Sequence, residues 1–293
     1  MADRDQRERQ SGDAQTFAVA LPVLTCPDCG DGFELQGRTV RCGNGHAFDL
    51  ARQGYLNLLT GKADPHVADT AAMVTARERF LSGRHYEPIA DAVAAAAGYA
   101  QIAAAGIAVE LAAGTGYYLA RLADAQPRGI GIAMDIARPA LQRAARCHPR
   151  VVAVGWDVWR RLPIADRSVA VVLSVFGPRN ALEIKRILRP GGAIVIVTPL
   201  PEHLNELRDP LGLVGIDPLK PSRLSASFDP VAQLESEVRC EYSIMLSRTD
   251  CLALAEMGPS AHHSTPAQLA ERADRLDELT EVSVAVRVST YRV

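Results

Sequence analysis

The pattern of apolar and polar residues changes period repeatedly along the chain, and these changes predict alternating strands and helices. Residues 106–113 (GIAVELAA) form a short apolar run typical of a strand, and residues 117–125 (YYLARLADA) have the spacing of an amphipathic helix. Further apolar runs are predicted as strands over 129–135, 150–157, 168–176 and 193–199, with helices over 139–148 and 181–192. This alternation predicts a doubly wound α/β fold.

Two regions extend this pattern. Late strands over 237–247 and 281–293 flank helices near 250–257 and 266–278, and they complete a predicted seven-stranded sheet with an antiparallel edge pair. Upstream, residues 71–100 show helical spacing that is interrupted at Gly83.

The composition fits one large core and a small accessory module, because the 293 residues are 48% hydrophobic. The first residues are polar and charged, without the apolar stretch of a signal peptide, and predict a disordered tail over 1–19. No run of about 18 apolar residues occurs, so we expect no membrane span. The net charge of −2 excludes general polyanion binding, and any nucleic-acid contact has to come from local patches.

Three of the six cysteines gather near the N-terminus, in the spacing Cys26-x2-Cys29-x12-Cys42-x3-His46. Two close ligand pairs separated by a short hairpin are typical of a tetrahedral zinc site. Four protein ligands leave no open position, so we expect structural zinc rather than catalytic zinc. The remaining cysteines are scattered, which argues against a secreted disulfide framework and favours a reducing cytoplasmic location.

Residues 109–120 (VELAAGTGYYLA) predict a strand, a glycine turn and a helix, in which Gly114 and Gly116 let a ligand approach the backbone. Asp135 ends the next strand, where an acid binds a ribose diol, and Asp157 ends the following one, where a carboxylate accepts from an adenine amino group.

The loop departs from the G-x-G-x-x-G pattern of dinucleotide sites, because Ala112 replaces the first glycine and nothing matches the third. Glu110 would repel a pyrophosphate and suit a cation. We therefore expect S-adenosylmethionine, which carries a sulfonium and an ammonium, rather than NAD. The alternative is an ordinary glycine turn in which Glu110 and Asp135 cap helices.

Together these segments resemble the RlmA-type methyltransferases of 23S ribosomal RNA, especially the actinobacterial members tied to tylosin-type macrolide resistance. The resemblance covers about residues 20–293. Besides the cysteine motif, it rests on the following stretches: HAFDLARQGYLNLL (46–59), GRHYEPI (83–89), ELAAGTGYY (110–118), FGPRN (176–180), EIKRILRPGG (183–192), TPLPEHLNEL (198–207) and MGPSAHH (257–263).

The resemblance implies a class I, Rossmann-like methyltransferase that methylates N1 of a guanine in a domain II hairpin of 23S rRNA near the peptide exit tunnel. It implies that Tyr86, Gly114, Thr115 and His203 contact the cofactor, and that the protein forms a homodimer. The chain departs from the family pattern at Ala112 and Ala113, where glycines are usual, and at Gly177, where alanine is expected.

On this basis we expect a zinc-binding RNA-recognition domain over 20–61, a helical linker and cofactor lid over 62–103, and a methyltransferase domain over 104–293. Guanine N1 is hidden by base pairing, so the target has to be unpaired or flipped out.

Several side chains are candidates for the acceptor side. Phe176, Trp156 and Trp159 could stack on the base. Arg179 and Asn180 follow the fourth strand at the ligand edge of the sheet, and the alternative for Arg179 is an ion pair with Glu183. Two other functions remain open: methylation of a small-molecule natural product, and non-catalytic binding of zinc and cofactor.

Overall fold

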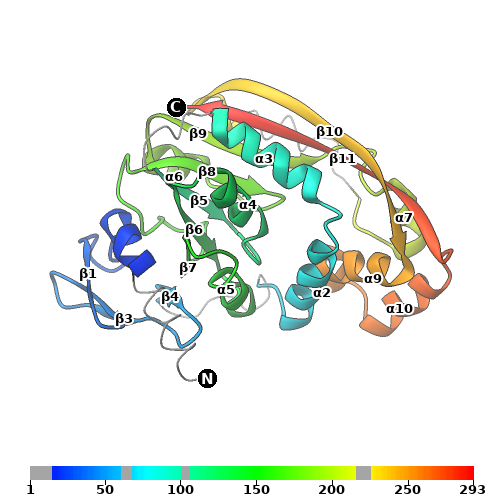
Figure 1. Ribbon diagram of the computed structural model, residues 1–293, viewed down its shortest axis with the longest axis horizontal. Coiled ribbons are helices and arrows are strands. Elements are labelled where there is room, and N and C mark those ends of the chain that lie inside the picture. Colours follow the sequence, from blue (N-terminus) through cyan, green and yellow to red (C-terminus); the bar gives the residue numbers. More distant parts are fainter. Residues whose placement is uncertain (1–14, 61–67, 100–105, 216–225) are drawn as a thin grey trace.

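An eight-stranded sheet with the order β10-β11-β9-β8-β5-β6-β7-β4 forms the centre of the computed structural model, which describes residues 15–60, 68–99, 106–215 and 226–293 (Figure 1). Its parallel strands include the five predicted from apolar runs: β5 (Ile107–Leu111), β6 (Ile130–Asp135), β7 (Val151–Gly155), β8 (Val169–Val175) and β9 (Leu188–Pro199). The chain order reverses between β5 and β8, and ligands of such sheets bind at this switch point.

The two late strands complete the sheet as predicted. β10 (Gln233–Ser247) and β11 (Leu279–Arg292) form an antiparallel pair, and β11 also pairs antiparallel with β9. Figure 1 shows this pair of strands, coloured yellow and red, extending beyond the sheet toward the helices α9 (Arg248–Met257) and α10 (Pro266–Asp274), which connect them in the chain.

Helices cover both faces of the sheet, which explains why every residue of β8 is buried. One core lies under α3 (Glu87–Tyr99), α4 (Tyr117–Ala125) and α5 (Arg138–Ala144), and contains Ala108 of β5. The opposite core lies under α6 (Ala181–Ile187) and contains the next residue, Val109. Consecutive strand residues therefore enter different cores, as the pleat requires.

The other helices lie around the ends of these layers. They include η1 (Leu21–Val23), α2 (Ala71–Ser82), α7 (Asn205–Leu211) and η2 (Pro259–His262). The predicted interruption at Gly83 separates α2 from α3. Both helices belong to the predicted lid region, but they pack differently: α2 packs against α9, whereas α3 packs against α4 and the sheet.

The N-terminal module is a three-stranded antiparallel sheet of β1 (Phe33–Gln36), β2 (Thr39–Cys42) and β3 (Ala47–Asp49). The chain then enters β4 (Tyr55–Asn57), which pairs parallel with β7 and adds an eighth strand to the predicted seven. The apolar interior of the module is continuous with the core under α6. The predicted zinc domain is thus fused to the α/β domain through shared pairing and packing.

Two boundaries differ from the sequence prediction. Residues 15–20 are helical and Phe17 is buried, so ordered structure begins within the predicted tail, whose first fourteen residues lie outside the described part. The helix predicted over 181–192 ends at Ile187, and the chain is already extended at Leu188. Pro190 explains this early end, because a proline disfavours helical conformation in the residue before it.

Candidate functional site

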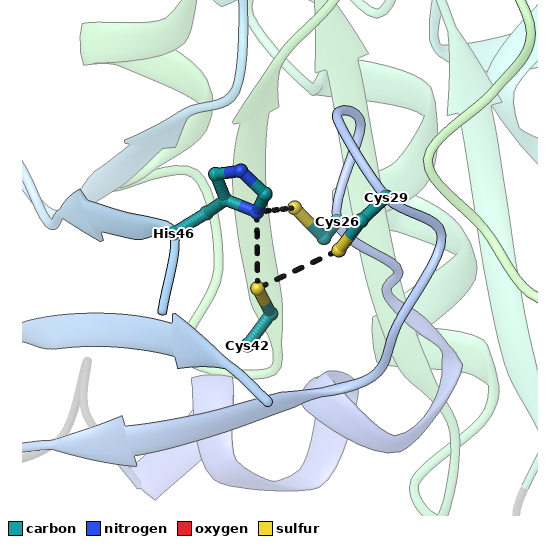
Figure 2. Close-up of side chains that lie close together, drawn as sticks. All are labelled: Cys26, Cys29, Cys42 and His46. Carbon is teal, nitrogen blue, oxygen red and sulfur yellow. Dashed lines mark hydrogen bonds between the residues drawn. The ribbon is translucent and has the colours of Figure 1, made fainter. Parts of the chain in front are cut away.

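The four predicted metal ligands converge in the N-terminal module, and their ligand atoms all lie within 4.8 Å of one another (Figure 2). The Sγ atoms of Cys29 and Cys42 are 3.6 Å apart, and Nδ1 of His46 lies 3.6 Å from Sγ of Cys26 and 3.3 Å from Sγ of Cys42. A tetrahedral zinc ion with ordinary bond lengths requires edges of about 3.8 Å between sulfurs and about 3.5 Å between sulfur and nitrogen. The donor set therefore fits zinc and fills its coordination shell.

Local turns create this arrangement. Gly30 donates its N–H to the carbonyl of Cys26 over 2.8 Å with φ +82°, and Gly45 donates to the carbonyl of Cys42 over 3.0 Å with φ +86°. Glycine suits both positions because it adopts this left-handed conformation without steric cost. Hydrogen bonding with Asn44 lowers the pKa of Cys29, whereas burial raises the pKa of Cys26, and a bound zinc ion requires both as thiolates.

A second site lies at the switch point of the large sheet, where a cavity opens beside the carboxyl ends of β5, β6, β7 and β8. Most of the residues predicted to bind cofactor or acceptor line this cavity: Tyr86, Glu110, Gly114, Thr115, Asp135, Trp156, Asp157, Trp159 and Phe176. Gly116, His203, Arg179 and Asn180 are not among its described lining residues. The fold thus brings predicted site residues between positions 86 and 176 of the chain to the lining of one cavity.

Asp135 is 8% exposed and accepts hydrogen bonds from the backbone N–H groups of Gly114 and Ala137, each over 2.8 Å. These bonds fix the glycine turn to the end of β6, and the carboxylate retains further acceptor capacity toward the cavity. Burial raises the pKa of Asp135 to about 6. The acid therefore has a structural role in the turn, and it also faces the cavity where a ribose acceptor was predicted.

Glu110 is nearly fully buried, and its carboxylate accepts from the N–H of Leu119 in the first turn of α4 over 3.1 Å. Burial raises the pKa of Glu110 to about 8. A cationic ligand in the cavity would stabilise the ionised form, because an opposite charge compensates for lost hydration.

Gly116 begins α4 in the left-handed conformation, with φ +77°. A Cβ atom there would lie 2.7 Å from Sγ of Cys147, so both the backbone and the packing require glycine.

An aromatic cluster closes one side of the cavity. The ring of Phe176 stacks on His203 at a centroid distance of 5.9 Å, and the Tyr86 hydroxyl lies 3.4 Å from Nε2 of His203. His203 accepts from the N–H of Ala285 at Nδ1, so its Nε2 carries the proton and donates to Tyr86. Burial lowers the pKa of His203 to about 4, which keeps the ring neutral at pH 7. His203 therefore reaches the cavity through Tyr86 and Phe176.

Sequence reasoning missed Arg77 on α2, which lies against the glycine turn and lines the cavity. Its guanidinium pairs with Asp69 and donates to the carbonyl of Met257 over 2.8 Å. Among the described lining residues Arg77 is the sole cationic side chain, alongside several carboxylates. No local pattern signals this role, because α2 reaches the turn only through the tertiary fold.

The departures from the family pattern at positions 112 and 177 are neighbours in space. Ala112 adopts φ +52°, and a Cβ atom added at Gly177 would lie 3.2 Å from the Ala112 Cβ. The absence of a side chain at Gly177 therefore leaves room for the methyl group of Ala112 at this edge of the cavity.

The acceptor-side candidates beyond the cavity have different surroundings. Asn180 caps α6 by accepting from the N–H of Glu183 over 3.3 Å. Glu183 pairs with Arg186 at 2.6 Å, so the alternative of an Arg179–Glu183 ion pair is wrong. Arg179 is partly buried, which lowers the pKa of its guanidinium.

This strand order, with a glycine turn after β5 and acids after β6 and β7, defines a class I S-adenosylmethionine-dependent methyltransferase that carries an N-terminal zinc ribbon. Residues 24–62 match the model for the zinc ribbon described as "RlmA, N-terminal". The chain belongs to the RlmA-type 23S rRNA (guanine-N1)-methyltransferases, because two relatives match almost its whole length.

One of these relatives is the 23S rRNA (guanine(748)-N(1))-methyltransferase of Streptomyces fradiae, which is 40% identical over 92% of this chain and 96% of its own. The other, from Micromonospora griseorubida, is provisionally named a 23S rRNA (guanine-N(1)-)-methyltransferase. It is 46% identical over 93% of this chain and 98% of its own.

Two solved structures with a similar fold have lower sequence identity. The YcgJ protein of Bacillus subtilis is 14% identical with a TM-score of 0.48, covering 71% of this chain and 98% of its own. The [4+2]-cyclase SpnF is 17% identical with a TM-score of 0.46, over 70% and 79%. In the described part of the chain, no helix is both long and apolar enough to cross a membrane.

Proposed function

We propose that the protein transfers a methyl group from S-adenosylmethionine to N1 of the guanine at position 748 of 23S rRNA, in the domain II hairpin near the peptide exit tunnel. The observation that carries this proposal is the 40% identity over nearly the full length of the Streptomyces fradiae guanine-748 enzyme. Resistance to tylosin-type macrolides is the expected consequence for the cell.

The residues of the cavity divide the task of holding the donor. S-adenosylmethionine supplies a methyl group activated by a positively charged sulfur. Asp135 accepts from the ribose hydroxyls and Asp157 from the adenine amino group, while Glu110 faces the cationic end. The backbone of Gly114 and Thr115 lets the donor approach closely. Gly116 does not line the cavity, and its left-handed conformation connects this turn to α4.

The carboxylate of the donor also requires a counter-charge. Arg77 lies against Gly114 and is the one cationic side chain in the described lining. We therefore assign this ion pair to Arg77, whose guanidinium would exchange part of its pairing with Asp69 for the donor carboxylate. Tyr86 contacts the donor directly, and His203 holds Tyr86 and Phe176 in place from behind.

The acceptor guanine enters beside Phe176, which directly follows β8 and lines the cavity. Alignment of donor and acceptor at contact distance lowers the barrier of such a displacement, which is the main task of these residues. The zinc ribbon holds the hairpin that carries the guanine, and we propose a homodimer as the form that binds it. Arg179 and Asn180 remain candidates for the outer part of this surface.

Primer extension on 23S rRNA tests the proposal. N1 methylation blocks base pairing, so reverse transcriptase should stop beside guanine 748 in RNA from cells that express the wild-type gene. The stop should be absent with Asp135→Ala, which removes the acid at the glycine turn. If the wild-type gene produces no stop although the purified protein binds S-adenosylmethionine, the proposal is wrong, and small-molecule methylation and non-catalytic binding are the alternatives to test.

A further inference from the structure

The three aromatic residues considered for base stacking differ sharply in what they contact. Trp156 is 5% exposed, and Phe176 is 37% exposed with its ring stacked on His203. Trp159 lines the same cavity, yet 60% of its surface is open to solvent. Its ring is therefore the most exposed of the three at the mouth of the cavity.

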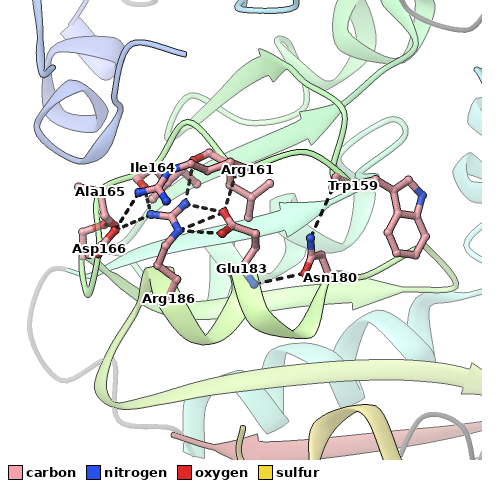
Figure 3. Close-up of polar contacts among 10 residues, drawn as sticks. Trp159, Arg161, Ile164, Ala165, Asp166, Asn180, Glu183 and Arg186 are labelled. Carbon is pink, nitrogen blue, oxygen red and sulfur yellow. Dashed lines mark hydrogen bonds and ion pairs between the residues drawn. The ribbon is translucent and has the colours of Figure 1, made fainter. Parts of the chain in front are cut away.

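The backbone of Trp159 is held although its ring is free. Its N–H donates to Oδ1 of Asp157 over 3.0 Å, and its carbonyl accepts from Nδ2 of Asn180 over 3.5 Å. Figure 3 shows the indole projecting away from Asn180 at one end of the network. Ordering the backbone before a partner arrives reduces the entropy that stacking would otherwise cost.

The segment 159–166 that begins with Trp159 is braced by α6. Arg186 donates to the carbonyls of Leu162 and Ile164 over 2.8 and 2.7 Å, and Glu183 accepts from the N–H of Leu162 over 2.7 Å (Figure 3). Arg186 and Glu183 also pair with each other, and both are largely buried. This ion pair, which we call the clamp, fixes the segment along its middle.

The far end of the same segment is joined to the zinc ribbon. Thr25 donates to the carbonyl of Pro163 over 3.0 Å, and Ala165 donates to the carbonyl of Val23 over 2.8 Å. Thr25 directly precedes the zinc ligand Cys26. Near Trp159, Arg160 also donates to the carbonyl of Thr60 over 3.1 Å, at the end of the ribbon region.

We propose that Trp159 stacks on a nucleobase of the RNA at the mouth of the cavity, and that segment 159–166 sets its position relative to the zinc ribbon bound to the same RNA. This inference rests on the proposed function. Single-stranded RNA sites combine an aromatic platform with nearby positive charge. Arg161 supplies such a charge, because its side chain is 73% exposed and its ion pair with Asp166 is long, at 3.7 Å.

Steady-state kinetics on a transcribed 23S rRNA fragment containing guanine 748 tests the proposal, using the full-length zinc-loaded protein. Trp159→Ala should raise KM for the RNA by about 10- to 100-fold, because stacking on an aromatic side chain is worth that much per base. Trp159→Tyr should restore most of the affinity, since it keeps a ring face. Leu182→Ala is the matched control, because Leu182 is 73% exposed on α6 and outside the cavity lining.

Three results would overturn the inference. The first is an unchanged KM for RNA in Trp159→Ala. The second is a weaker Kd for S-adenosylmethionine with normal RNA affinity, which would place the indole on the adenine of the donor. The third is an equal loss in Leu182→Ala. If the wild-type protein methylates nothing in this RNA, the proposed function fails, whereas methylation that is indifferent to Trp159 refutes only the stacking.

Discussion

At the residue scale, two residues at the edge of the cavity carry backbone strain. Ala112 and Phe176 follow β5 and β8, and both adopt left-handed φ angles, +52° and +55°, that side chains other than glycine rarely take. Each such residue costs on the order of 1–3 kcal/mol, which the surrounding structure has to offset. Sequence reasoning placed both residues near the ligand but had no means to find their conformation.

The contact between Ala112 and Gly177 yields a prediction about non-additivity. Gly177→Ala should lower the free energy of unfolding by about 1 kcal/mol, because its new Cβ meets the Ala112 Cβ at 3.2 Å. Ala112→Gly should be neutral or stabilising by up to about 1 kcal/mol, since glycine tolerates the left-handed angle. Urea unfolding of both single variants and the double variant measures these changes.

The double variant decides whether the two positions are coupled. Once Ala112 is glycine, the methyl group at position 177 has room, so its cost should fall by more than half. Equal costs of Gly177→Ala in both backgrounds would show that the two departures from the family pattern are independent.

At the element scale, α6 acts as a brace for the segment 159–166 as well as covering the sheet. The clamp of Arg186 and Glu183 donates to and accepts from the backbone of this irregular segment at Leu162 and Ile164. Irregular backbone that carries a functional side chain needs such support from a rigid element to hold its position.

Arg186→Met should break the clamp and leave Glu183 buried without its partner. Loss of one member of a buried pair costs about 3–5 kcal/mol, so the free energy of unfolding should fall by an amount of this order. KM for RNA should rise because the segment loses its position, while Kd for S-adenosylmethionine changes by less than about threefold. Chemical unfolding, RNA kinetics and calorimetry measure the three quantities.

Lys185→Met on the same helix is the matched control. Lys185 is exposed, and its substitution removes one positive charge from the same helix without breaking the clamp. A similar rise in KM for RNA in both variants would assign the effect to charge instead of position.

At the scale of the whole molecule, the zinc ribbon and the methyltransferase domain form one packed unit. β4 extends the large sheet, and the interior of the ribbon is continuous with the core under α6. The cavity for the donor nevertheless lies among β5, β6, β7, β8 and α2. Damage to the zinc centre should therefore affect the RNA more than the donor.

Cys42→Ser should lose the zinc ion, because three ligands hold it far less tightly than four. RNA methylation should fall by at least about 100-fold, since the ribbon no longer keeps its fold, while Kd for S-adenosylmethionine should stay within about threefold. Metal analysis and calorimetry on the same preparation measure both effects. Cys240→Ser, on the distant strand β10, should change neither, and a Cys42→Ser protein with stoichiometric zinc would disprove the site.

The sequence alone determined most elements of the fold, because period and turn signals depend on neighbouring residues. It also identified the zinc ligands, since they lie within 21 residues and local turns bring them together. Glu110, Gly114, Asp135 and Asp157 were placed at one site for a related reason: parallel strands in a known order end at the same edge.

Only the tertiary structure decided which distant residues meet at that edge. Arg77 reaches the glycine turn from α2, and His203 reaches Tyr86 across 117 positions of the chain. Nothing local distinguishes the buried Trp156 from the exposed Trp159, or predicts that β4 pairs with β7. Such pairings depend on how helices and strands pack against elements far away in sequence, and this packing leaves no periodic signal in the chain.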